Sequence, residues 1–186
     1  MTTLLNRCLT ALLLLFSLNA ANAAYTDCSG VIAGLVDGAV GCEISDATQD
    51  FLNTAPLTVN EDGGFFSIAD WMFIGKDEGA NGDGLGQAGE WNLAANVWSL
   101  YDNIMLVFKG GRDTRLVGYL LDGQTTSGDW LSPFRAPDFD VRNVKDVSHI
   151  SFYGTQAAVP EPSALMLLSL GLVGLGAIRR GRGKSA

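Results

Sequence analysis

Two hydrophobic segments, one at each end of the chain, limit the part that can fold as a domain in water. Near the C-terminus an apolar run over 164–178 is followed by a basic end, 179–186. As a helix, these 15 residues would span roughly 22 Å, which is short of the roughly 30 Å hydrocarbon core of a bilayer. Arginines after the run can snorkel and the bilayer can thin locally, so we expect a transmembrane helix over 164–178.

The alternative for this run is a buried helix of a soluble core. Such a helix usually carries polar residues at 3.6-residue spacing on its outer face, and this run has none. Basic residues beside a membrane helix stay on the cytoplasmic side, which sets the expected orientation. The basic residues here are Arg179, Arg180, Arg182 and Lys184.

The N-terminus has the parts of a secretory signal peptide. Arg7 supplies a positive charge, residues 8–18 form an apolar stretch, and Ala21-Asn22-Ala23 fits the small-residue cleavage pattern. We expect cleavage between Ala23 and Ala24, which makes residues 1–23 the signal peptide. The domain that remains, 24–158, has 135 residues, enough to bury a substantial core.

Residues 159–186 resemble the PEP-CTERM sorting signal of Gram-negative, polysaccharide-producing bacteria. The resemblance rests on Pro160, Glu161 and Pro162, on the apolar span and on the basic end. It implies export by the secretion machinery, an intermediate anchored in the inner membrane, and recognition by exosortase, a membrane-embedded enzyme resembling a cysteine transpeptidase. The tail would be cut near the motif, as in other anchors whose hydrophobic tail is removed. The remaining protein would reach the cell surface or the extracellular matrix.

The charges of the chain are unevenly distributed. Residues 24–158 hold 19 Asp and Glu against 7 Lys and Arg, a net charge of −12, whereas residues 179–186 carry +4. Nucleic-acid binding needs basic patches, so the acidic domain argues against nucleic acid as a partner. Such a domain suits a soluble surface protein, or one that meets divalent cations.

Cys28 and Cys42 remain once Cys8 has left with the signal peptide. An even number of cysteines in an exported protein predicts a disulfide. This one would close a loop of about 15 residues and contribute roughly 3 kcal/mol by restricting the unfolded chain. The alternative is a reactive or metal-binding thiol pair, although no histidine lies close in the sequence and the spacing fits no zinc motif.

Short apolar runs separated by glycines predict an all-β domain. Several short strands with glycine turns favour a two-sheet β-sandwich of the jelly-roll kind. Helix is expected at most over 46–52 and, ambiguously, over 92–100. The expected strands are 64–75, 103–109, 115–121, 138–144 and 147–153, with a hairpin turn over 110–113. The phrases that resemble the ectodomains of PEP-CTERM proteins, and so support the sandwich, are 108–111, 127–130 and 147–154.

The acidic, glycine-rich stretch 77–90 has part of the spacing of an EF-hand loop. If Glu90 is the last ligand of such a loop, Asn81 and Asp83 fall at ligand positions, but glycine stands at the first position and Asp77 would have to substitute. One hypothesis is therefore a Ca²⁺ site made of Asp77, Asn81, Asp83 and Glu90. The other is a flexible acidic glycine loop between strands.

His149 is the only histidine of the chain, and no local pattern supplies it with a nucleophile and an orienting carboxylate. We interpret it as a structural residue. The aromatic residues could form a platform for sugar rings, although tryptophans in a domain of this size usually fill the core. Trp91 and Trp130, which are flanked by glycine and polar residues, are the two that we expect to be exposed.

The main hypothesis from the sequence is a non-enzymatic exported protein of the cell surface or extracellular matrix. It would associate with exopolysaccharide, with the cell envelope or with copies of itself. We assign no catalytic residue, and no cofactor other than the possible Ca²⁺. Two alternatives stay open: a secreted glycan-active hydrolase that uses two carboxylates in a groove, and a calcium-dependent adhesin built on residues 77–90.

Overall fold

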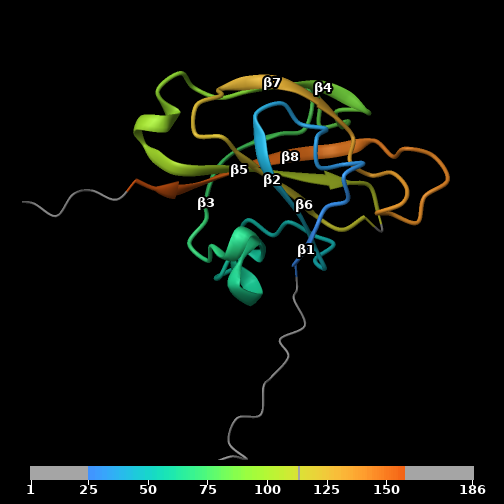
Figure 1. The fold of residues 1–186 in the computed structure, drawn as a ribbon, viewed down its shortest axis with the longest axis horizontal. Helices are drawn as coiled ribbons and strands as arrows, with labels where there is room; N and C mark the ends of the chain where they lie inside the picture. The colour runs from blue at the N-terminus through green and yellow to red at the C-terminus, as the bar shows by residue number, and fades with distance from the viewer. Residues whose placement is uncertain (1–24, 113, 158–186) are drawn as a thin grey trace, which may run out of the picture.

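A computed structural model of the chain describes residues 25–112 and 114–157 (Figure 1). Within these ranges eight strands form two sheets, accompanied by three short 3₁₀ segments. The expected signal peptide, sorting motif, basic cluster and helix over 164–178 lie outside the described residues. Inside them, no helix has the length and apolar character needed to span a bilayer.

The larger sheet of the described chain has six strands in the order β1-β2-β6-β5-β8-β3, each antiparallel to its neighbours. The central strands β5 and β8 are buried on both faces over most of their length. A strand covered on both faces requires a run of apolar residues without alternation, which β5 supplies. The strands are β1 (Tyr25–Asp27), β2 (Ala39–Ser45), β3 (Met72–Asp77), β5 (Tyr101–Gly110), β6 (Val117–Leu121) and β8 (Val147–Gln156).

The smaller sheet pairs β4 (Ala88–Asn92) with β7 (Ser127–Leu131) and lies over one face of the larger sheet, at the top of Figure 1. The core between the two sheets is aromatic. Phe108 of β5 makes edge contacts with Trp130 and Tyr119, with ring centroids 5.6 and 5.3 Å apart. This packing fixes the smaller sheet over the centre of the larger one.

The other face of the larger sheet is covered by the segment before β3, which contains η1 (Thr58–Gly63) and η2 (Phe65–Ser67). Phe65 and Trp71 of this segment are buried against Met105 and Tyr153 of the sheet. The domain therefore has a layer on each side of its main sheet, one a small sheet and the other an irregular segment.

The all-β prediction is confirmed by two sheets and the near absence of helix. Residues 46–52 are not helical, and 92–100 contains only the short η3 (Val97–Ser99). The jelly-roll connectivity stays a prediction.

The prediction of a strand over 64–75 is wrong in its first half. Gly64 has φ +76°, and the chain turns there into η2 before it becomes extended at Met72. The Asn60 side chain holds this turn, because its amide donates to the Trp71 carbonyl and its oxygen accepts from the Trp71 N–H, both at 2.9 Å. The fixed turn makes the segment a cover for the sheet rather than one of its strands.

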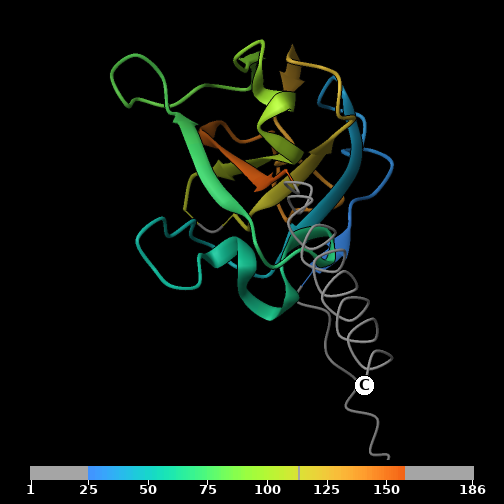
Figure 2. The same ribbon diagram turned by 90° about the vertical axis from the view of Figure 1, so that its left-hand side faces the viewer.

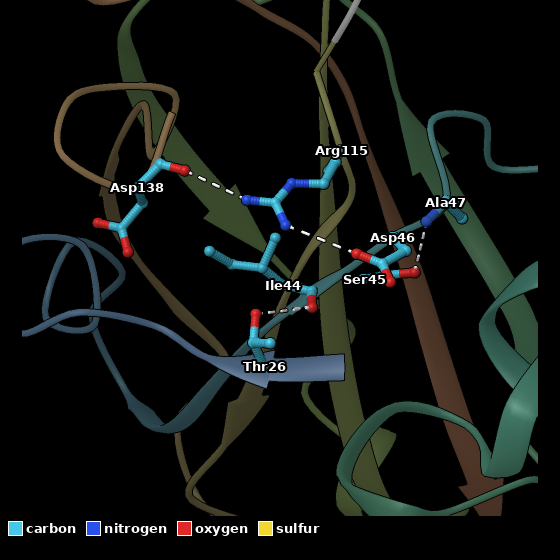
Figure 3. Close-up of polar contacts among 7 residues, drawn as sticks. All are labelled: Thr26, Ile44, Ser45, Asp46, Ala47, Arg115 and Asp138. Carbon is cyan, nitrogen blue, oxygen red and sulfur yellow. Dashed lines mark hydrogen bonds and ion pairs between the residues drawn. The ribbon is translucent and has the colours of Figure 1, made fainter. Parts of the chain in front are cut away.

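The expected strand over 138–144 is also absent from the described chain, because Asp138 serves as an anchor for other loops. Its carboxylate accepts hydrogen bonds from the backbone N–H and the hydroxyl of Ser29. In Figure 3 the guanidinium of Arg115 lies between Asp46 and Asp138, 3.6 Å from the Asp46 carboxylate and donating to the Asp138 carbonyl at 3.2 Å. These contacts connect the segment before β6 to two surface loops.

The predicted disulfide is present: Cys28 and Cys42 are bonded, with Cα atoms 5.4 Å apart. It joins the segment after β1 to the middle of β2, beside a backbone hydrogen bond from Cys28 N–H to the Cys42 carbonyl at 3.1 Å.

Candidate functional site

The two sheets are joined along one side of the domain and separated along the other. On the joined side, the segment 35–37 bonds to β7: Leu131 N–H donates to Leu35 O at 2.8 Å, and Asp37 N–H donates to Asp129 O at 3.0 Å. On the separated side, β3 is the edge of the larger sheet and β4 is the facing strand of the smaller one. Figure 2 shows β3 at this edge, with the loop between β3 and β4 extending beyond it.

A groove of about 580 Å³ lies between these two strands. Its apolar lining comes from four elements and the residues beside them, and its polar groups come from β3 and β4. The apolar residues are Ile74, Leu93, Val97, Leu100, Tyr101 and Phe152. The polar residues are Lys76, Asp77, Glu90 and Asn92.

The polar groups of the groove are mostly hydrogen-bond acceptors. Lys76 lies 2.6 Å from the Glu78 carboxylate, and this hydrogen bond and charge hold the pKa of Glu78 below its usual value. The carboxylate of Glu78, which is not among the residues lining the groove, thus partly balances the positive charge of Lys76. Asp77 accepts one hydrogen bond, from the Gly79 N–H at 3.1 Å. The groove can therefore take a ligand with an apolar face and several hydroxyl groups, with Tyr101 and Phe152 against the apolar face.

The structure does not bring the four candidate calcium ligands together. Asp77 and Glu90 line the groove, whereas Asp83 lines a separate hollow and Asn81 is exposed in the loop. Over the described residues, no group of three or more His, Cys, Asp or Glu is arranged to hold a metal ion.

The loop between β3 and β4 has the backbone of a glycine turn. Gly79, Gly82, Gly84 and Gly86 all have positive φ, a conformation that glycine adopts without strain. Gly84 N–H donates to the Glu78 carbonyl at 3.2 Å, which closes the loop on itself. This geometry matches the glycine-loop interpretation of residues 77–90.

His149 lies on β8, directly opposite Lys109 of β5, and is not among the residues that line the groove. Partial burial, together with the positive charge of Lys76, lowers its pKa below the ordinary value of 6.5. Four positions further along β8, the Tyr153 hydroxyl donates to Asp50, and burial, with this carboxylate, raises the pKa of Tyr153. The face of β8 that carries His149 and Tyr153 therefore lies among packed side chains, whereas Phe152, on the opposite face, lines the groove.

The expectation that Trp91 and Trp130 are exposed is wrong: each is only 2% exposed. The glycines around them do not mark an open surface. Each indole lies over the glycine of the opposite strand, because Trp91 pairs with Gly128 and Trp130 with Gly89. The two aromatic rings that the groove does present, Tyr101 and Phe152, were not singled out from the sequence as groove residues.

Residues 158–181 match the family model described as PEP-CTERM protein-sorting motif. No curated protein and no solved structure matches the chain. The matched segment contains the Pro160-Glu161-Pro162 motif and begins directly after the last described residue, Ala157. The chain therefore carries a PEP-CTERM sorting motif, which supports its being an exported substrate of exosortase.

Proposed function

We propose that this protein is released from its membrane anchor by exosortase and acts at the cell surface or in the extracellular matrix, where the groove between β3 and β4 binds polysaccharide. The observation that carries the proposal is the groove itself, which two aromatic residues and several aliphatic ones line together with two carboxylates and an amide. Its volume lies within the range of about 300–1,000 Å³ that is typical of small-molecule sites.

The chemistry of a sugar fits both parts of this lining. The C–H faces of a sugar ring are apolar and pack on aromatic rings, here Tyr101 and Phe152. Sugar hydroxyls donate to carboxylates such as Asp77 and exchange hydrogen bonds with an amide such as Asn92.

The position of the tail is compatible with cleavage that leaves the groove intact. The last strand, β8, ends at Gln156, and Ala157 N–H donates to the Leu100 carbonyl at 3.3 Å. The matched motif begins at the next residue, 158. A cut inside the motif would remove no strand and no residue of the groove.

Mass spectrometry of the exported protein tests the processing step. We expect the mature protein to begin at Ala24 and to end near the Pro-Glu-Pro motif. An exported protein that retains its C-terminus through Ala186 would contradict processing, whatever the groove binds.

The binding function is tested by affinity electrophoresis of the full chain, in mild detergent, in gels that contain dextran, galactomannan, hydroxyethyl cellulose or alginate. We expect at least one polymer to retard the protein, and Asp77→Asn with Asn92→Ala to weaken that binding about tenfold. The matched control is Asp27→Asn, which removes an exposed carboxylate from β1, the opposite edge strand of the larger sheet. Equal binding by both variants and the unchanged protein, or binding by none, would refute the proposal.

A second candidate, a glycan hydrolase, is favoured by one observation: Asp77 and Glu90 line the same groove as the two aromatic rings. A glycosidase needs two carboxyls, one of which stays protonated in an apolar setting. Both carboxyls here are exposed, which is why we propose a binding protein rather than an enzyme. New reducing ends after incubation with a polysaccharide, lost in Glu90→Gln, would instead establish the hydrolase.

A further inference from the structure

The two strands of the smaller sheet carry the same tripeptide pattern, glycine, acid, tryptophan, over 89–91 and 128–130. They pair in antiparallel register about the acids, with Glu90 opposite Asp129. The tryptophans are buried toward the core and the two acids are exposed. The sheet therefore presents two carboxylates that face each other directly, an arrangement that is destabilising in an antiparallel pair.

A third carboxylate joins these two. Asp37 lies beside β7, where its side chain accepts a hydrogen bond from the Asp129 N–H at 3.2 Å. All three acids line a hollow of about 320 Å³, together with Trp91, Asn92 and Ser127. Neither ion pair of the described chain, Lys76–Glu78 or Arg115–Asp46, involves any of the three.

The hollow also has a hydrogen-bond donor without an acceptor. The indole Nε1 of Trp91 is fully buried and has no hydrogen-bond partner in the described structure, although the residue lines the hollow. Its nearest neighbours include Gly128, where an added Cβ would lie 3.1 Å from Nε1. Buried N–H groups are almost always paired in folded proteins, so an unpaired one beside a hollow indicates a missing acceptor.

These groups together select the chemistry of the missing ligand. A metal ion would gain nothing from an N–H donor, and the acids are not arranged to hold one within the described residues. An anion would be repelled by three carboxylates. A hydroxyl group can accept from the Trp91 N–H and at the same time donate to a carboxylate, so a neutral sugar satisfies both.

The hollow also adjoins the groove. Glu90 and Asn92 line both of them, so β4 forms a ridge with a binding surface on each side. We propose that the hollow is a second sugar subsite, which binds a neutral unit of the same polysaccharide chain as it crosses β4, with the Trp91 indole N–H donating to one of its hydroxyls. This inference rests on the proposed function.

Two tryptophan variants of the full chain, compared in the same affinity gels with dextran, galactomannan, hydroxyethyl cellulose and alginate, test the subsite. Trp91→Phe removes the N–H and keeps an aromatic ring in the core. Trp130→Phe is the matched control: its Nε1 is also buried without a partner, but the residue does not line the hollow. We expect Trp91→Phe to weaken binding of the neutral polymer roughly three- to tenfold and Trp130→Phe to leave it unchanged.

A third variant, Asp129→Asn, separates binding from folding. It relieves the repulsion with Glu90, so we expect a higher melting temperature together with weaker polysaccharide binding. A merely structural role for Asp129 would not move these two readouts in opposite directions.

The outcomes distinguish the two proposals. If the unchanged protein binds none of the polymers, the proposed function fails and the subsite fails with it. If it binds one, but Trp91→Phe and Asp129→Asn bind as well as Trp130→Phe, the subsite is refuted and the groove stands. Binding to alginate alone would support the groove and overturn the assignment of a neutral unit.

Discussion

Removal of the Cys28–Cys42 disulfide should lower the stability of the domain without changing its fold. The segment that the bond encloses is held by other contacts as well. The Tyr119 hydroxyl donates to the Ile32 carbonyl at 2.8 Å, and Val36 forms a bridge with Trp130. Because these contacts persist without the bond, the main effect of its loss should be a larger entropy of the unfolded chain.

The loop length sets the magnitude of this effect. The two cysteines are 14 residues apart, and closing a loop of about 15 residues is worth roughly 3 kcal/mol in the chain-entropy model. For a domain of about 130 residues, unfolding entropies of roughly 2 cal/mol/K per residue convert this to a fall in melting temperature of about 10 °C.

The assay is reversible urea and thermal unfolding of the full chain in detergent, comparing the unchanged protein with Cys28→Ala/Cys42→Ala. Reduced unchanged protein is a second arm, since it lacks the bond but keeps both sulfurs. We expect the two arms to agree within about 1 kcal/mol, the uncertainty of such extrapolations. A loss below about 1 kcal/mol in both arms would show that the bond does not constrain the unfolded chain. A large loss in the alanine variant alone would assign the effect to packing around Cys42.

Three further changes follow from the packing and charges. Gly89→Ala should destabilise by about 1–3 kcal/mol in urea unfolding, because the added Cβ would lie 2.8 Å from the Trp130 ring, whereas Gly111→Ala, with open space around it, should stay within about 0.5 kcal/mol. Equal effects would contradict this packing. Lys109→Met should lower the free energy of unfolding by about 2–3 kcal/mol, because the buried ammonium donates to the carbonyls of Gly110 and Gly111 at 2.9 and 2.8 Å. An unchanged midpoint of urea unfolding would refute this expectation. Because the pKa of His149 is lowered in the folded protein, the unfolded chain takes up this proton at a higher pH than the folded one. The free energy of unfolding should therefore fall as the pH drops below 6.5. In His149→Gln it should fall less between pH 7.5 and 5.5. Parallel pH profiles of the two proteins would contradict this.

The strands that could be predicted from the sequence are those buried on both faces. The run 103–109 lies within β5, and 147–153 lies within β8, since continuous apolar residues are what central strands require. The hairpin is also confirmed, with Phe108 opposite Val117. The disulfide followed from cysteine count and export alone.

The groove and the smaller sheet could not be predicted in the same way. The groove takes its lining from β3, β4, β5 and β8, which are far apart in the sequence, so no local pattern marks it. Strands β4 and β7 have five residues each, and the glycine and acid in them are the residues that also make turns. The sorting tail was recognised because its motif, apolar span and basic end are consecutive.

Trp91 and Trp130 were wrongly predicted to be exposed. Their burial shows that the register of β4 against β7 determines which side chains enter the core and which lie on the surface. Pairing about Glu90 and Asp129 places each indole over a glycine, which leaves room for the ring on the buried face. A slip of either strand by one residue would expose the indole of that strand and bury its acid, so the core specifies this register strongly. The same register then fixes the two carboxylates opposite each other on the exposed face. Burial of the tryptophans therefore fixes the position of the acidic hollow. The repulsion between the two carboxylates persists because the packing of the core does not permit another pairing.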